Sequence, residues 1–142
     1  ITDMTDHLTK EKRSWNMSRI KSKNSAPEIA VRKLLHSLGF RYKLYDPKLP
    51  GKPDLVFPKY KLALFVHGCF WHKHQGCKRS SNPSSNKKYW TAKLGRNVQR
   101  DAENKKALLD LGWNPALIWE CETKDTDLLM KAVKREFKGI IN

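Results

Sequence analysis

The sequence predicts an α/β layered fold in a single domain, with helices covering a central sheet. Three observations support this fold class. The length of 142 residues suits one domain with a core of its own. The predicted elements follow the order helix, three strands, helix, strand and helix, without a tandem repeat. The run from Leu62 to Val66 is almost continuously apolar, which is typical of a central strand covered on both faces.

The first helix is predicted to begin at Ser25, which serves as its N-cap. Pro27 lies in the first turn and Glu28 takes the third position of a capping box, so this glutamate has a structural explanation without any chemistry. The apolar face of this helix is expected to consist of Ile29, Val31, Leu34, Leu35 and Leu38.

Four strands are expected, over residues 40–45, 54–57, 62–66 and 113–120. Pro115 then belongs near the start of the last strand or at an edge of the sheet, because proline cannot donate a ladder hydrogen bond. The third strand places His67 at its carboxyl end, where functional sites in α/β sheets tend to lie.

Gly39 ends the first helix, and Gly112 ends a second one that is expected over residues 89–111. The candidates for the buried face of this second helix are Leu94, Val98, Ala102, Leu108 and Leu109. Asp125 or Asp127 is expected to cap a final helix. Its inward-facing residues are expected to be Leu128, Leu129, Ala132, Val133 and Phe137.

The formal net charge of +15 is far more than solubility requires, and it indicates a polyanionic partner such as nucleic acid. A basic binding protein without catalytic chemistry is the alternative at this point. There is no signal-peptide segment and no apolar run long enough to span a membrane, so a cytoplasmic protein without a membrane partner is expected. Three cysteines cannot all pair within one chain, which fits reduced thiolates in that setting.

Residues 1–24 are predicted to be a basic N-terminal arm, and residues 25–142 the single domain. Met17 and Ile20 interrupt the cations of this arm. A tail without a fixed fold is one interpretation. The other is an arm that wraps DNA and pushes apolar side chains between base steps. The sequence does not decide between them.

The segment 66–77 concentrates the chemistry, since it holds three of the five histidines and two of the three cysteines. Both residue types are usual zinc ligands, and the spacing suits a tetrahedral set without an open position, which is typical of structural zinc. The expected ligands are Cys69, His74, Cys77 and Cys121. On spacing alone, His72 could replace His74. The alternative is that Cys69 and Cys121 are buried apolar thiols.

Asp54 follows Pro53 on one strand and precedes a second strand, which is the skeleton of a nuclease metal site. The common form continues about a dozen residues later with Glu-x-Lys, whereas this chain has Val66 followed by His67. The backbone carbonyl of Val66 could take the place of the missing carboxylate, because Mg²⁺ accepts any hard oxygen ligand. His67 or His72 could then act as base or acid. Otherwise Asp54 only ends a turn.

Six segments together resemble one known family. They are residues 19–28 (RIKSKNSAPE), 49–54 (LPGKPD), 65–72 (FVHGCFWH), 97–101 (NVQRD), 112–113 (GW) and 119–121 (WEC). In this order, over roughly residues 12–122, the chain resembles the very short patch repair (Vsr) endonucleases, and the His-Gly-Cys-Phe-Trp-His core is the specific signature. The resemblance implies a type II restriction endonuclease-like fold, an α/β sandwich whose central mixed sheet is flanked by helices, with a structural zinc.

The activity implied by the resemblance is Mg²⁺-dependent nicking of duplex DNA on the 5′ side of the thymine in a T:G mismatch. Such mismatches arise when 5-methylcytosine deaminates. By the same resemblance, Asp54 and the carbonyl of Val66 hold Mg²⁺, His72 with Glu28 activates or orients water, and His67 assists at the phosphate.

The resemblance also implies how the mismatch is recognised. Phe70, Trp71 and Trp90 look like an aromatic wedge beside the mismatch, with Met17 and Ile20 arriving from the minor groove. The alternative for Phe70 and Trp71 is core packing. Two adjacent residues on a strand or loop cannot easily face the same interior, however, so at least one of them is expected to be exposed. The further residues expected to contact DNA are Lys21, Lys23, Lys93, Asn97 and Arg100.

The expected partners are double-stranded DNA with a T:G mismatch and mismatch-repair proteins, and the chain is expected to act as a monomer. Two alternatives stay open. One is a nuclease of the same kind without mismatch preference, used in homing or defence. The other is a catalytically inactive, zinc-stabilised DNA-binding module.

Overall fold

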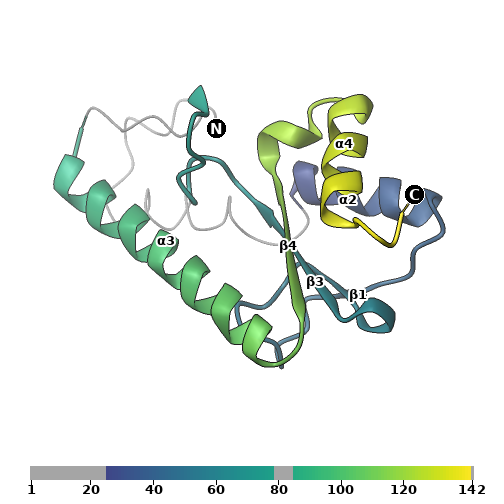
Figure 1. Ribbon diagram of the computed structural model, residues 1–142. Helices are drawn as coiled ribbons and strands as arrows, with labels where there is room; N and C mark the ends of the chain where they lie inside the picture. The colour runs from purple at the N-terminus through teal and green to yellow at the C-terminus, as the bar shows by residue number, and fades with distance from the viewer. Residues whose placement is uncertain (1–24, 79–84, 142) are drawn as a thin grey trace, which may run out of the picture.

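The computed structural model describes residues 25–78 and 85–141 (Figure 1). The elements in chain order are α2 (Ala26–Ser37), β1 (Lys43–Leu44), β2 (Leu55–Phe57), β3 (Leu62–His67), α3 (Lys87–Asp110), β4 (Asn114–Trp119) and α4 (Thr126–Glu136). This is the predicted order, and the α/β class is confirmed. The predicted arm, with Met17, Ile20, Lys21 and Lys23, lies outside the described residues.

The sheet of the described residues has four strands in the order β1-β2-β3-β4. The first two pairings are antiparallel, and β3 pairs with β4 in parallel, with His67 opposite Trp119. Helix α3 supplies the crossover that a parallel pair requires. The carboxyl ends of β3 and β4 therefore lie side by side, although the paired residues Val66 and Ile118 are 52 positions apart in the sequence.

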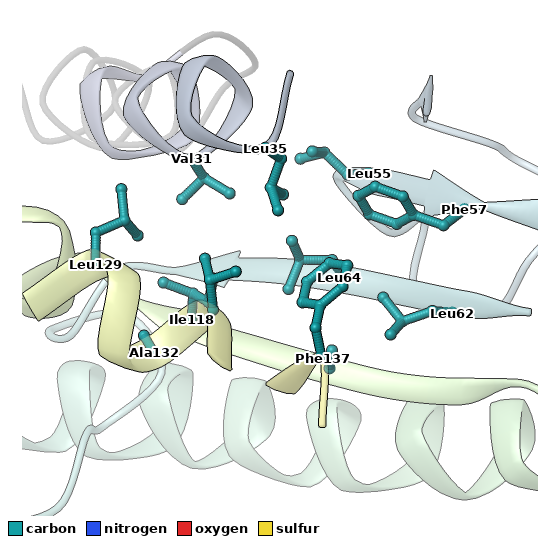
Figure 2. Close-up of a cluster of buried hydrophobic side chains, with 12 residues drawn as sticks. Val31, Leu35, Leu55, Phe57, Leu62, Leu64, Ile118, Leu129, Ala132 and Phe137 are labelled. Carbon is teal, nitrogen blue, oxygen red and sulfur yellow. The ribbon is translucent and has the colours of Figure 1, made fainter. Parts of the chain in front are cut away.

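Helices α2 and α4 lie on one side of the sheet and α3 lies on the other (Figure 1). Side chains of α2, the sheet and α4 meet in the main core, which Figure 2 shows. Its buried members are Val31, Leu35, Leu55, Phe57, Leu62, Leu64, Ala116, Ile118, Leu129, Ala132, Val133 and Phe137. A smaller cluster of Leu49, Val56, Ala63 and Leu108 fills the opposite face.

Strand β3 carries alternate residues into both cores, as a strand with two covered faces must. Leu62 and Leu64 enter the main core, whereas Ala63 enters the smaller one, and all three are fully buried. The predicted central position of this strand is confirmed. Pro115 is the second residue of β4, which is an edge strand among the described residues, as expected.

Several residues that the sequence predicted on the buried faces of the helices are exposed in the structure. Leu38, Val98, Leu109 and Leu128 are 41%, 42%, 53% and 42% exposed, and Ala102 is exposed as well. On α3 the buried residues are Leu94, Asn97 and Leu108. At about 100° per residue, these define a stripe that also passes through positions 101 and 104, so it is partly polar. A search for apolar residues alone selects the wrong side of such a helix.

The predicted strand over residues 40–45 is paired only at Lys43 and Leu44. Phe40 and Tyr42 instead pack against the main core. The N-cap predictions at Ser25 and Asp125 are confirmed, since each side chain accepts a backbone N–H from three residues on. None of the helices in the described ranges has the length and apolar character needed to cross a membrane.

Candidate active site

The cysteine and histidine cluster lies where β3 and β4 end together. Nδ1 of His74 is 3.5 Å from Sγ of Cys69 and 3.5 Å from Sγ of Cys121. With Cys77, the four ligand atoms lie within 4.8 Å of one another. Tetrahedral zinc with bonds of about 2.3 Å to sulfur and 2.0 Å to nitrogen separates such atoms by about 3.5 Å. The residues present therefore fit a closed Cys3His zinc site.

The cysteine pKa values point the same way. Burial raises the pKa of Cys69 to about 12 and also raises that of Cys121, because clustered thiols resist ionisation in an apolar surrounding. A divalent cation would reverse this by stabilising the thiolates. The backbone N–H of Cys69 donates to Oε1 of Glu120 at 3.2 Å, which ties the loop after β3 to the turn after β4.

Asp54 immediately precedes β2, and its Oδ2 accepts the backbone N–H of Val66 at 2.7 Å. The antiparallel pairing of β2 with β3 brings these two residues together. The pKa of Asp54 is raised to about 7, mainly by burial and also by the Glu28 carboxylate, while the Val66 N–H and the Arg32 guanidinium act against them. A half-buried carboxylate of this kind is stabilised by a bound cation.

Glu28 lies in the first turn of α2 and is only 4% exposed. Its backbone N–H donates to Oγ of Ser25 at 3.4 Å, as the predicted cap requires. Its carboxylate, however, bonds the side chains of Arg32 and Tyr45. The capping box therefore does not account for this glutamate, because its side chain turns toward a network beside Asp54.

His67 and His72 stack face to face, with ring centroids 3.7 Å apart and planes 7° from parallel. Nδ1 of His72 is 2.6 Å from Oδ2 of Asp101, and Nδ1 of His67 is 4.0 Å from the same oxygen. Burial lowers the pKa of His67 to about 3, and His72 lowers it further, whereas Asp101 opposes the change. His67 is consequently neutral across the physiological range of pH.

Stacking limits what this trio can hold. A metal ion lies close to the plane of an imidazole that binds it, and two parallel planes cannot share one ion. His67, His72 and Asp101 are therefore better suited to moving protons than to binding a cation together. Asp101 fixes the orientation of His72, in the way that a carboxylate orients the histidine of a hydrolase.

These groups open into one groove of about 1320 Å³. It is lined by the carboxylates of Glu28, Asp54 and Asp101, by His67 and His72, and by the cations Arg100 and Lys105. Phe70 and Trp71 line it as well. Acid, base and cationic groups thus converge in a single concave site.

The aromatic residues form a cluster between the loop after β3 and α3. Ring centroids of Phe70 and Trp71 are each within 5.3–5.8 Å of Trp90. Trp71 is only 8% exposed and Phe70 is half-buried, so the expectation that one of them is exposed is wrong. They pack on each other and on α3 because they lie in a turn, where adjacent side chains can face one interior.

The other predicted contact residues on α3 have distinct positions. Asn97 is buried and donates from Nδ2 to the carbonyl of Trp71 at 3.1 Å, so it holds the aromatic turn. Lys93 lies 6.0 Å from the centroids of Trp71 and Tyr89. Arg100 is exposed and lines the groove.

Three residues near the site were not assigned roles from the sequence. Asp101 belongs to the polar stripe of α3, and its helical spacing from Asn97 was a usable signal. Arg32 lies four residues after Glu28, which is the spacing of a helical ion pair. Tyr45 had no signal, because its contact with Glu28 depends on tertiary folding alone.

Comparison with known proteins gives the class of this molecule. A family profile described as "DNA mismatch endonuclease Vsr" matches residues 5–79. The chain is 48% identical over 126 residues to "Type II nicking enzyme V.XorIIP" of Xanthomonas oryzae pv. oryzae (strain KACC10331 / KXO85), covering 89% of this chain and 92% of that protein. It is 36% identical over 126 residues to "DNA mismatch endonuclease Vsr" of Escherichia coli (strain K12), covering 89% and 80%.

A third relative is "Type II nicking enzyme V.NmeAIP" of Neisseria meningitidis serogroup A, 44% identical over 137 residues, or 96% of this chain and 97% of that protein. The groove and these similarities together define a DNA endonuclease. The chain belongs to the Vsr family of DNA mismatch endonucleases.

Proposed function

We propose that this endonuclease nicks duplex DNA on the 5′ side of the thymine in a T:G mismatch, in a reaction that requires Mg²⁺. The observation that carries the proposal is the pairing of the half-buried Asp54 carboxylate with Val66 in a groove that His67 and His72 also line. The fold is that of the type II restriction endonucleases. The order of the elements and the mixed sheet support this assignment.

Asp54 and the carbonyl of Val66 hold the Mg²⁺ ion. The fit rests on the donor chemistry, since both offer hard oxygens and Asp54 is a half-buried carboxylate with its pKa raised to about 7. When bound, Mg²⁺ polarises a phosphate oxygen and favours ionisation of a nearby water.

The histidines and Glu28 handle the water and the phosphate. The Asp101 carboxylate accepts a hydrogen bond from Nδ1–H of His72, which leaves Nε2 of His72 without a proton. Nε2 then acts as the base that, with Glu28, activates or orients water. His67 is neutral because its pKa is about 3. It therefore assists at the phosphate as a neutral hydrogen-bonding group rather than as an imidazolium.

The zinc ion is structural, bound by Cys69, His74, Cys77 and Cys121. No coordination position stays open in this set, and no substrate group has to reach it. Its role is to hold the loop that carries Phe70, Trp71 and His72 against the end of β4. The geometry of the four ligand atoms supports this assignment.

Mismatch preference comes from the aromatic cluster of Phe70, Trp71 and Trp90, together with Met17 and Ile20 of the arm. A T:G pair is easier to unstack than a matched pair, so a wedge of rings favours it. Because Trp71 is buried among the described residues, the wedge acts as a packed unit rather than as a free side chain. The other predicted DNA-binding residues contact the DNA backbone or hold the wedge in place. They are Lys21, Lys23, Lys93, Asn97 and Arg100.

The protein acts as a monomer in the cytoplasm, with duplex DNA and mismatch-repair proteins as its partners. Relatives named for mismatch cleavage and for nicking support the DNA-directed part of this proposal.

A nicking assay tests the proposal, with T:G, C:G and T:A duplexes of one sequence, in Mg²⁺ and in EDTA. We expect single-strand cleavage of the T:G duplex in Mg²⁺ alone. Equal cleavage of all three duplexes would favour a nuclease without mismatch preference. Binding without cleavage would favour an inactive DNA-binding module, and cleavage in EDTA would exclude the metal requirement.

A further inference from the structure

Arg32 and Tyr45 meet behind Glu28. Nη2 of Arg32 donates to Oε2 of Glu28 and also contacts the Tyr45 hydroxyl, which itself donates to the same carboxylate oxygen. The guanidinium lies 5.5 Å from the centroid of the Tyr45 ring. The side chains of Arg32 and Glu28 are only 15% and 5% exposed, so solvent screens this contact little. Two groups from two separate segments thus fix one carboxylate.

Tyr45 also reaches the second carboxylate residue, through its main chain. Its N–H donates to the backbone carbonyl of Asp54 at 3.3 Å. To make both contacts, Tyr45 takes φ of +51°, a left-handed conformation that an aromatic residue rarely adopts. Strain of this kind persists only where the surroundings enforce it, and it tends to occur at functional sites. Here the surroundings are the bonds to Glu28 and Asp54.

Arg32 lies near two acidic groups, the buried Glu28 and the half-buried Asp54. Glu28 and Asp54 repel each other, and the positive charge of Arg32 opposes that repulsion at Asp54. The guanidinium holds its place although its own Nε is buried without a hydrogen-bond partner. Its position is therefore set by the contacts of Nη2 with Glu28 and Tyr45, at the cost of an unsatisfied Nε.

Among the described residues, neither Arg32 nor Tyr45 lines the groove, whereas Glu28 and Asp54 do. Arg32 and Tyr45 can therefore affect the reaction only by acting on the carboxylates of Glu28 and Asp54. We propose that Arg32 and Tyr45 are positioning residues, which hold the Glu28 carboxylate beside Asp54 in the orientation that the DNA-cleavage reaction uses. The inference rests on the proposed function, because it assigns Glu28 and Asp54 to the reaction.

Two variants remove the contacts one at a time. Tyr45→Phe deletes the hydroxyl and keeps the ring, and Arg32→Leu removes the charge, while Arg32→Lys keeps a positive charge without the planar guanidinium. Tyr42→Phe is the matched control. Its hydroxyl donates to the backbone carbonyl of Arg32 at 3.4 Å, on the same helix but away from the carboxylate.

We expect Tyr45→Phe and Arg32→Leu to lower kcat for nicking by roughly 10–100-fold with little change in KM for the duplex. Arg32→Lys should recover part of the loss, and Tyr42→Phe should keep the wild-type kcat. In a Glu28→Ala background, the substitutions at Arg32 and Tyr45 should have almost no further effect, because they act through Glu28. Thermal unfolding of every variant separates these effects from loss of fold.

A second readout does not depend on cleavage. Calorimetric titration of the DNA-free protein with Mn²⁺ at pH 8 should show affinity several-fold tighter in Arg32→Leu than in the wild type and in Tyr42→Phe, since Asp54 then faces Glu28 without the opposing cation and Mn²⁺ relieves their repulsion. Unchanged kcat and unchanged Mn²⁺ affinity in folded Arg32→Leu and Tyr45→Phe proteins would overturn the inference. Equal losses with and without Glu28 would overturn it too.

The failure of the proposed function has a different signature. In that case the wild-type protein itself does not nick the T:G duplex, and the Mn²⁺ titration still decides whether Arg32 acts on the carboxylates.

Discussion

Replacing Asp54 by asparagine should stabilise the metal-free protein at pH 8 while abolishing nicking. The pKa of Asp54 rises from 3.8 to about 7 on folding, mainly because the carboxyl is buried. Between these two values the folded protein binds more protons than the unfolded chain, so stability falls as pH rises through that window. A shift of roughly three units at 1.36 kcal/mol each amounts to about 4 kcal/mol above pH 7.

Asparagine is isosteric, cannot ionise, and can still accept the Val66 N–H through its side-chain oxygen. The variant should therefore gain about 4 kcal/mol in the free energy of unfolding at pH 8, on the order of 10 °C in Tm, and almost nothing at pH 4. Denaturant unfolding without added Mg²⁺ at both pH values measures the gain. Added Mg²⁺ should stabilise the wild type at pH 8 but not the variant.

Asp110→Asn serves as the control, since Asp110 is exposed at the end of α3 and should change stability by less than about 0.5 kcal/mol at either pH. The reasoning is refuted if Asp54→Asn is no more stable than wild type at pH 8, or if its gain is the same at pH 4. The first result would mean that Asp54 is well solvated, and the second that the gain has nothing to do with charge.

Three further predictions concern the zinc, the wedge and the charge. Cys121→Ala should lose the bound zinc and much of the stability, and metal analysis that finds full zinc in this variant would exclude the ligand set. Trp71→Ala should lower the free energy of unfolding by about 3–5 kcal/mol, because the ring is buried. It should also lower the T:G preference of the folded fraction about tenfold. An unchanged preference would assign mismatch recognition to the arm instead. DNA binding in EDTA should weaken steeply with salt, and Lys93→Ala should lower the slope of log K against log salt by about 0.9, whereas a flat salt response would contradict the DNA-backbone contacts.

Much of the fold could be predicted from local sequence patterns. Caps at Ser25 and Asp125 and the apolar run of β3 are signals read within a few residues, and each matches the structure. Spacing could not decide whether His72 or His74 is the zinc ligand, because both lie in the loop between Cys69 and Cys77. The tertiary structure distinguishes the two, since His72 contacts the Asp101 carboxylate whereas His74 lies beside the cysteines.

The parts of the site that the sequence missed depend on distant pairs. Asp101 lies 29 residues from His72, on a helix whose buried stripe is partly polar, so an apolar period points to the wrong side. Tyr45 contacts Glu28 from 17 residues away with a left-handed backbone, and no residue pattern predicts that conformation for an aromatic side chain. The supporting residues of a site are thus harder to predict than the groups that they support.

The central claim is most directly tested by single-turnover cleavage of a duplex end-labelled on the thymine strand. With wild-type protein and Mg²⁺, the account predicts one product, cut on the 5′ side of the mismatched thymine, formed much faster from T:G than from the C:G duplex of the same sequence. Asp54→Asn should give no product while still binding the duplex. Cleavage at the same rate on the C:G duplex, or any cleavage by Asp54→Asn, would contradict the account.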